Sequence, residues 1–348
     1  MSCPDTGPLV SVLMPVYNGE RFLREAVDSI LSQTFTDFEF IIIDDGSTDD
    51  TADILRLYAQ QDKRIRLHHQ TNQGIVAALN TGLGMARGKY LARMDADDIS
   101  LPGRFAAQVD FLEAHPDVGA LGCSVQVMDR ESVLSSIWRV PTEHGVLKWQ
   151  TCFSCPLMHP TVMMRREVVE RVGGYDPGME HAEDYDLWRR LSGVTRLANL
   201  DDVLLHLRKH GGNVSATRSS EQRANSIRIS ALMIANILGE EPPAAVVQSL
   251  WERRFDKASD ARAGAELVYR LYQAIAASGD LSSREKRSVR RDAAARMWNI
   301  GRPWAKDVRV WGVLARACSL DPLIPLRLAG ARLRRVFPCV YGRSRGRS

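Results

Sequence analysis

The 348-residue chain lacks the features that mark several protein classes. No apolar run approaches the roughly 20 residues of a membrane-spanning helix, and the N-terminus lacks the basic and apolar regions of a signal peptide. The six cysteines show no disulfide-framework spacing, and the one close pair, Cys152 and Cys155, has no second pair to complete a zinc site. We therefore expect a cytoplasmic protein in a reducing compartment.

Positive charge is concentrated at the C-terminal end. The formal net charge is +4, and residues 301–348 contain eleven basic and two acidic residues, so the rest of the chain is net acidic. Apolar and aromatic residues are interleaved with these arginines, which is typical of a segment lying on an anionic membrane surface. The alternative is a helical cap with a solvated basic end. We expect no nucleic-acid partner, because no recognised binding module accompanies the arginines.

The first hundred residues alternate between apolar runs of strand length and stretches with helical spacing. Strands are predicted at Val10–Met14, Phe38–Ile43, Ile65–Leu67 and Lys89–Met94, with helices between them. This alternation predicts an α/β fold in which right-handed crossovers build a Rossmann-like, mostly parallel sheet with flanking helices.

Beyond Asp98 the alternation is less regular. Helices are predicted at Phe105–Ala114, Glu167–Val172 and Asp184–Leu191, and strands at Val118–Met128, Thr161–Met164 and Leu204–Leu207. From about residue 220 to 300 the sequence is helical and rich in Ala and Arg. We therefore expect a helical C-terminal region after the sheet.

Acidic residues follow two of the predicted strands. Asp44 and Asp45 come directly after Ile41–Ile43, and Asp95, Asp97 and Asp98 follow the fourth strand. The carboxyl ends of parallel strands form the edge at which such sheets bind ligands. Without a covering cluster of Lys or Arg, these acids favour a divalent cation or ligand hydroxyl and N–H groups, all of which a metal-bound nucleoside diphosphate supplies. The alternative for residues 95–98 is that they cap the next helix or solvate a turn.

Five motifs occur in an order that resembles the signature of family 2 glycosyltransferases. They are Pro15-Val16-Tyr17-Asn18, Asp44-Asp45-Gly46-Ser47-Thr48-Asp49, Asn72-Gln73-Gly74, Asp95-Ala96-Asp97-Asp98 and Glu183-Asp184. The resemblance spans about residues 8 to 215 and implies the GT-A fold. It implies a catalytic domain over 1–218, with a nucleotide-binding half (8–100) and an acceptor half (101–218). A helical region (219–300) and a basic amphipathic tail (301–348) would follow.

The resemblance implies a cation, Mn²⁺ or Mg²⁺, at the second acidic group. Asp97 would hold the metal, with Asp95 and Asp98 near the sugar or ribose, and Asp95 also counted among the metal ligands. His210 lies in a stretch resembling the loop that closes over the diphosphate, and would bind a phosphate or complete the metal shell. A loop histidine without function is the alternative.

The remaining motif residues are assigned to the nucleotide sugar. Pro15, Tyr17 and Asn18 follow the first strand, where the Tyr17 ring can stack on a base, although a tyrosine there is more often part of a core. Asp45 can accept hydrogen bonds from a base or ribose, and Asp44 either supports it or caps the next helix. Asn72 and Gly74 open a helix, and amides at a helix N-terminus suit a phosphate.

By resemblance, Asp184 is the catalytic base. It would remove the proton of the acceptor hydroxyl, so that a single displacement inverts the anomeric centre, and Glu183 would orient Asp184 or the acceptor. The alternative is a pair of acids that only stabilises a helix N-terminus. His159 lies in a stretch resembling the family's acceptor-side strand, and His181 is left unassigned.

These residues predict an inverting, metal-dependent glycosyltransferase that uses a UDP- or dTDP-linked sugar. The Gln-x-x-Arg-Trp sequence of processive members is absent, so we expect transfer of one sugar to a cell-surface glycan or lipid-linked acceptor. The protein would act in the cytoplasm or on the inner face of the membrane. Alternatives are a sugar-phosphate nucleotidyltransferase, a glycosidase with paired carboxylates and a non-catalytic nucleotide-sugar sensor.

Overall fold

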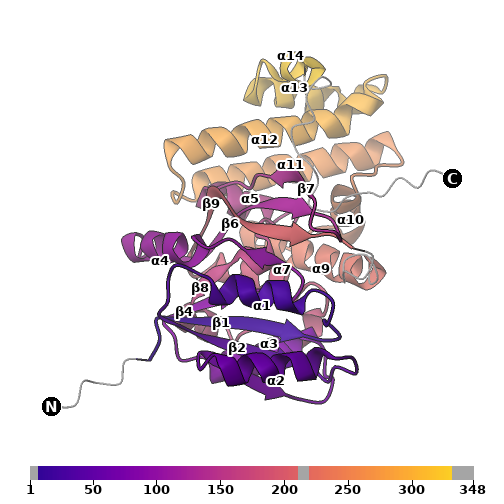
Figure 1. Ribbon diagram of the computed structural model, residues 1–348. Helices are drawn as coiled ribbons and strands as arrows, with labels where there is room; N and C mark the ends of the chain where they lie inside the picture. The colour runs from indigo at the N-terminus through magenta and orange to yellow at the C-terminus, as the bar shows by residue number, and fades with distance from the viewer. Residues whose placement is uncertain (1–6, 211–218, 331–348) are drawn as a thin grey trace. The chain divides into compact units, whose positions relative to one another are not determined.

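The computed structural model describes residues 7–210 and 219–330, which divide into two compact units (Figure 1). The first unit contains the described residues up to Thr142 and those from Pro156 to Gln222. The second contains Glu143–Cys155 together with the described residues from Arg223 onward. A short internal segment is therefore built into the C-terminal unit rather than into the unit that surrounds it in sequence.

The first unit is built on one sheet, in the order β3-β2-β1-β4-β8-β6-β9-β5, with β7 paired to β6. The strands are β1 (Val10–Val16), β2 (Phe38–Asp44), β3 (Ile65–His69), β4 (Tyr90–Arg93), β5 (Ile99–Ser100), β6 (Val118–Met128), β7 (Leu134–Trp138), β8 (Met163–Arg165) and β9 (Arg196–Arg208). The four strands predicted in the first hundred residues are confirmed, with ends displaced by a few residues.

Strands β1 to β4 are parallel neighbours with helices on both faces, as the alternation predicts. Alternate residues such as Val12, Phe40 and Ile42 pack in one core with α1 (Leu23–Leu31) and α2 (Thr51–Gln61). The intervening residues face α3 (Ile75–Met85), where Gly82 lies against Leu13 and Ile43. Because strand side chains alternate between faces, these continuous apolar runs bury both faces of the sheet.

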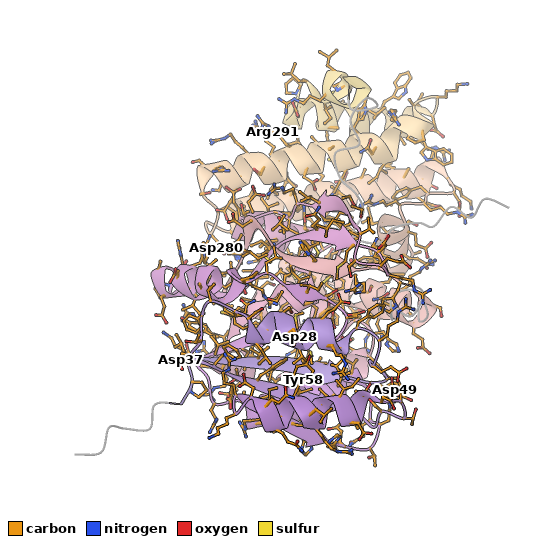
Figure 2. All side chains as sticks on the ribbon, viewed as in Figure 1. Asp28, Asp37, Asp49, Tyr58, Asp280 and Arg291 are labelled. Carbon is orange, nitrogen blue, oxygen red and sulfur yellow. The ribbon has the colours of Figure 1, made fainter. Side chains whose placement is uncertain are left out.

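Helices α1 and α2 are joined by a hydrogen bond between side chains on their outer surface. The Tyr58 hydroxyl donates to Asp28 Oδ1 over 2.8 Å, and both residues are labelled in Figure 2. Partial burial, followed by this hydrogen bond to Asp28, raises the pKa of Tyr58 to about 12. The bond links two helices that pack through their apolar residues on one face of the sheet.

The second half of the sheet is mixed in direction. Strand β8 runs antiparallel between β4 and β6, β6 is parallel to β9, and β5 and β7 pair antiparallel at the margins. The strand predicted from Thr161 begins at Met163, because His159–Thr161 form a 3₁₀ turn with Pro160 in its first positions. The helices here are α4 (Arg104–Ala114), α6 (Arg166–Arg171) and α7 (Glu183–Leu191).

The second unit is helical. It draws on α5 (His144–Gln150), α9 (Ser219–Leu238), α10 (Ala244–Glu252), α11 (Ala258–Ala277), α12 (Ser283–Gly301), α13 (Trp311–Leu320) and α14 (Ile324–Gly330). Its core includes Trp149, Leu271 and Met297. Helix α12 begins at a capping box formed by Ser282 and Glu285. Within the described residues, no helix has the length and apolar content needed to cross a membrane.

Candidate active site

Asp44 and Asp45 lie where β2 ends, next to the end of β1. Asp45 N donates to Val16 O over 2.9 Å. Both Asp45 oxygens accept main-chain N–H groups of the loop before α3, Oδ1 from Gln73 (3.0 Å) and Oδ2 from Gly74 (2.9 Å). Gly74 has φ +87°, a backbone conformation that favours glycine. The structure therefore brings Asp45 and the Asn72–Gly74 motif together, with the carboxylate holding the loop.

Asp44 is buried and fully engaged by its own surroundings. Its Oδ1 accepts the N–H of Ser47 (3.0 Å), and its Oδ2 lies 2.8 Å from His69 Nδ1. Helix α2 begins after Asp50, so Asp44 binds the turn before the helix rather than capping the helix itself. It thus shapes the Gly46–Ser47 turn beside Asp45.

The loop after β1 presents Tyr17 to solvent. The Tyr17 side chain is 52% exposed, which removes the interpretation of this residue as part of a core. Asn18 has φ +50°, and its Oδ1 accepts the N–H of Thr48 over 2.8 Å. Pro15 lies within β1, opposite Ile43 of β2. The first two motifs are therefore joined through Asn18, with an aromatic ring free to receive a flat ligand.

The second acidic group forms a compact cluster directly after β4. Carboxylate oxygens of Asp95, Asp97 and Asp98 lie within 4.8 Å of one another. His210 Nε2 lies 2.8 Å from Asp97 Oδ2, so a histidine from a distant stretch of the chain contacts the cluster. Arg208 N donates to Asp98 Oδ1 and Arg208 Nε to Asp97 O, both over 2.8 Å. Strand β9 thus fixes the backbone that carries the cluster.

The electrostatics of this cluster fit a divalent cation. Burial, followed by repulsion from Asp97 and Asp95, raises the pKa of Asp98 well above its usual range. Burial likewise raises the pKa of Asp95. Asp98 Oδ2 is buried and has no hydrogen-bond partner among the described residues. Three carboxylates with one imidazole form a mainly oxygen ligand set, which suits Mn²⁺ or Mg²⁺.

Glu183 and Asp184 form the first turn of α7. Glu183 is 6% exposed; burial and then the Asp184 charge raise its pKa to about 8. Its Oε2 has no hydrogen-bond partner within the described residues. Asp184 is partly exposed, and its Oδ1 accepts the N–H of Tyr185 over 2.7 Å. The two neighbouring acids therefore have different environments: Glu183 holds a proton at neutral pH, and Asp184 reaches solvent.

A buried group of side chains links the acidic cluster to α7. The charges of Asp95, Glu183 and Asp184 all act on the Tyr175 hydroxyl, so the two acidic groups border one region. His159 Nε2 lies 2.8 Å from Tyr175 Oη. Burial, followed by a nearby positive charge, lowers the pKa of His159 well below its usual range. His159 is therefore a neutral residue inside the site. His181, with φ +64°, instead lies 3.5 Å from Glu221.

Sequence reasoning missed the arginines near the acids. It treated the acidic edge as uncovered, but Arg93, the last residue of β4, is 2% exposed and its guanidinium forms an ion pair with Asp95. Arg104 and Arg208 are also buried beside this edge. The available signal was a charged residue at the end of the apolar run Tyr90–Met94, immediately before the first acid.

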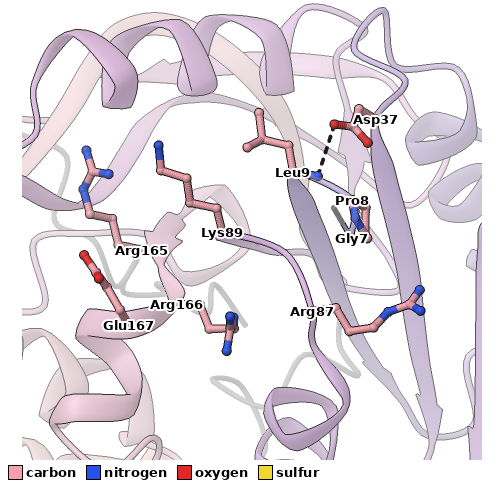
Figure 3. A pocket seen from close by; sticks show the side chains of 9 residues that line it. All are labelled: Gly7, Pro8, Leu9, Asp37, Arg87, Lys89, Arg165, Arg166 and Glu167. Carbon is pink, nitrogen blue, oxygen red and sulfur yellow. Dashed lines mark hydrogen bonds between the residues drawn. The ribbon is translucent and has the colours of Figure 1, made fainter. Parts of the chain in front are cut away.

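A hollow in the first unit lies at the opposite edge of the sheet (Figure 3). Its lining includes residues that precede β1, β2 and β4, namely Leu9, Asp37 and Lys89. Leu9 N donates to Asp37 Oδ2 over 3.3 Å, and Lys89 pairs with Glu113. None of the predicted site residues lines this hollow. The predicted acidic site residues lie at the carboxyl edge instead.

The fold, with acids at the carboxyl edge of a doubly wound sheet and a helical C-terminal unit, is that of GT-A glycosyltransferases. The family model "Glycosyl transferase family 2" matches residues 11–173. An uncharacterized glycosyltransferase from Haemophilus influenzae is 34% identical over 232 residues, covering 64% of this chain and 72% of that protein. The chain belongs to glycosyl transferase family 2 and is a glycosyltransferase.

Solved structures agree with the fold. Residues 1–349 of S. aureus TarS in complex with UDP-GlcNAc superimpose with a TM-score of 0.55 at 18% identity, covering 91% of this chain and 92% of that one. The mannosyltransferase PcManGT from Pyrobaculum calidifontis, in complex with GDP-Man and Mn²⁺, gives a TM-score of 0.52 at 22% identity. The overlap covers 96% of this chain and 89% of that one.

Proposed function

We propose that the protein transfers a single sugar from a UDP- or dTDP-linked donor to a cell-surface glycan or lipid-linked acceptor, with inversion at the anomeric carbon. One observation carries the proposal: the cluster of Asp95, Asp97 and Asp98 and the acids of α7 border the same buried region. That arrangement suits a donor diphosphate on one side and a proton acceptor on the other. UDP-GlcNAc and GDP-Man in the similar structures support a nucleotide-sugar donor.

In this proposal the acidic cluster holds Mn²⁺ or Mg²⁺. Asp97, Asp95 and His210 would be the ligands, and Mn²⁺ in the mannosyltransferase complex supports the choice of ion. The bound cation supplies positive charge opposite the diphosphate that departs from the sugar. Asp98, held by Arg208 N, remains beside the cluster and faces the sugar or ribose.

Asp184 removes the proton of the attacking hydroxyl. The acceptor oxygen then forms its bond to the anomeric carbon while the bond to the β-phosphate oxygen breaks, which inverts the configuration. A partly exposed carboxylate serves here because proton transfer accompanies attack. Glu183, protonated at neutral pH, has a proton to donate and orients Asp184 or the acceptor hydroxyl.

The nucleotide binds over the loops at the ends of β1 and β2. The exposed ring of Tyr17 stacks on the base. Asp45 keeps the Asn72–Gly74 loop in place, since it already accepts the N–H groups of Gln73 and Gly74. Loss of Asp45 should therefore weaken donor binding through the loop as well as through any direct contact.

Release of free nucleotide tests this function. Purified full-length protein is incubated with UDP-, dTDP- and GDP-linked sugars and Mn²⁺, with and without a chelator. We expect release from one donor class that stops on chelation. Release that ignores the chelator would contradict the metal assignment, and retention of turnover by Asp184→Asn would contradict the base. Asp110→Asn, on the exposed side of α4, is the matched control for loss of a carboxylate.

We further propose that the C-terminal unit contacts an anionic membrane surface, where a lipid-linked acceptor would be met. Four large apolar side chains of its described residues are at least half exposed: Val308, Trp311, Leu323 and Leu326. Basic residues lie among them in sequence, including exposed Arg309 and Arg316, and exposed Arg302 and Lys306 come just before them. Helix α12 adds exposed Lys286, Arg287, Arg290 and Arg291. Apolar anchors beside cations are the composition that binds anionic lipid. Residues 331–348 of the predicted tail lie outside the described residues.

Substitution tests this contact better than truncation does. Val310, Val313 and Ala317 are buried in the core of the second unit, so removing everything after Ile300 would open that core. Trp311→Ser combined with Leu326→Ser should lower sedimentation with phosphatidylglycerol vesicles, while Leu57→Ser, at a half-exposed leucine of α2, should not. Equal sedimentation of all variants would contradict the proposal.

A further inference from the structure

Arg93 is a buried cation at the centre of the sheet. It ends β4, its N–H donates to Val162 O over 2.9 Å, and its backbone carbonyl accepts from Arg104 Nη2 over 2.6 Å. The strand next to it in the parallel half is β1, where Leu13 is its register partner. These bonds fix the Arg93 backbone. The guanidinium is buried and occupies one region of the interior.

That region is the one between the acidic cluster and α7. The guanidinium pairs with Asp95, and its charge also acts on Tyr175 and Glu183. It is the positive charge that lowers the pKa of His159, after burial. These partners come from the loop after β4, the segment before α7, α7 itself and η1 (His159–Thr161). A single buried side chain thus acts electrostatically on four segments that border the site.

Arg93 is also incompletely satisfied. Its Nε has no hydrogen-bond partner within the described residues, and the same holds for Glu183 Oε2. Buried polar atoms are nearly always paired, and an unpaired guanidinium nitrogen is costly to bury. By contrast Arg165 on β8, also buried, donates to the backbone carbonyls of Val118, Leu112 and His115. Arg165 has a structural role, and Arg93 retains binding capacity.

We propose that Arg93 is a positioning residue that acts on both sides of the site: its buried guanidinium holds Asp95 for the metal-bound donor and places a positive charge near Glu183, beside the base. This inference rests on the proposed function for its catalytic consequence. The coupling to Glu183 itself does not, and it can be measured without any substrate.

The direct readout is the titration of Glu183. Its δ-carboxyl ¹³C resonance is followed in labelled protein and assigned by its absence in Glu183→Gln. The groups that face this carboxyl are Asp184 on the same helix, Arg93 from β4, Asp95 after β4 and Tyr175 before α7. Among them only Arg93 is positive. In Arg93→Met the midpoint should therefore move to higher pH by about one unit or more, and in Arg93→Lys by much less.

Turnover gives the second readout. Arg93→Met should lower kcat by about 100-fold, and Arg93→Lys, which keeps the charge but not the planar fork, by about 10-fold. Arg165→Met is the matched control, because it removes a buried arginine of the same sheet away from the acids. It should lower thermal stability but leave the Glu183 midpoint in place. Arg93→Gln replaces Arg93→Met if the latter does not fold.

An unchanged Glu183 midpoint in a folded, charge-free Arg93 variant would overturn the proposal and leave Arg93 a packing residue. The same applies if Arg165→Met moves the midpoint equally. If the midpoint moves as expected but the wild-type protein releases nucleotide from no donor, the proposed function fails while the Arg93–Glu183 coupling stands.

Discussion

The two edges of the sheet differ in whether their buried charged groups have partners. At the amino edge, charged side chains find partners: Glu39 accepts from Ser11 and pairs with Arg66 and Arg87, and Lys89 pairs with Glu113. Although burial raises the pKa of Glu39, these hydrogen bonds lower it overall. The charged groups at this edge therefore have hydrogen-bond or ion-pair partners and a structural role.

At the carboxyl edge, Asp44 and Asp45 have hydrogen-bond partners too, but the acids after β4 and at the start of α7 do not all have them. Burial raises the pKa of Asp98 and of Glu183, and both carboxyl groups keep a buried oxygen without a hydrogen-bond partner among the described residues. Buried carboxyl groups with unpaired oxygens and raised pKa values are typical of sites that bind a ligand. These unpaired carboxyl groups are the reason that we propose binding at the carboxyl edge, whereas the hollow of Figure 3 lies at the amino edge.

The largest expected effect is at the carboxyl edge, on turnover. Asp184→Asn should lower kcat by about 10³-fold, because the amide cannot take the acceptor proton. Donor binding, measured by calorimetry with Mn²⁺ and the donor that releases nucleotide, should be nearly unchanged. A variant that binds donor and keeps its turnover would assign the protein to a sensor role and remove the proposed base.

Mn²⁺ binding and metal-dependent turnover should depend on the side chains of the acidic cluster. Asp97→Asn should lower kcat by about 100-fold and weaken Mn²⁺ binding, because it removes one of the two carboxylate ligands proposed for the cation. His210→Ala should weaken Mn²⁺ less, by about 10-fold, since it loses one neutral ligand. Titration of Mn²⁺ by electron paramagnetic resonance gives both values. Equal Mn²⁺ affinity in wild type and Asp97→Asn would place the cation elsewhere.

At the amino edge the same kind of change should affect stability instead. Glu39→Gln breaks a buried, multiply paired carboxylate and should lower the free energy of unfolding by about 3 kcal/mol. Turnover measured well below the melting temperature should stay within about twofold of wild type. Urea unfolding and nucleotide release on one preparation test this. Loss of activity in a fully folded Glu39→Gln protein would mean that the edges are not independent.

The last effect is a change in how stability depends on pH, without a loss of any contact. Glu183 has a folded pKa of about 8 against an ordinary value of 4.5, so the unfolded chain releases this proton first. Its contribution to stability is fully present below pH 4.5 and is lost as the pH rises to about 8. Glu183→Gln should therefore gain stability relative to wild type as the pH rises through this window. Urea unfolding of both proteins at pH 5 and pH 8 measures this change. If the stability difference between Glu183→Gln and wild type is the same at both pH values, Glu183 is not a buried, protonated group.

Much of the first unit could be predicted from local patterns. Runs such as Phe38–Asp44 are apolar on both faces, and only a strand covered by helices on both sides buries such a run. The short strands β5 and β7 were not predictable in this way, because β5 has two residues and β7 is exposed. The direction of β8 was not predictable either. Its apolar residues are compatible with a strand that runs parallel or antiparallel to β4.

The apolar pattern alone places Asp44, Asp45, Asp95, Asp97 and Asp98 after strands, and hence at one edge of the sheet, because the carboxyl ends of parallel strands share that edge. What each acid contacts depends on how the chain folds. Asp45 accepts from its own loop, His210 joins Asp97, and Arg93 turns inward to pair with Asp95. The physical reason is that periodicity encodes which side chains are buried, whereas partner choice depends on chain segments up to 113 residues apart meeting in space.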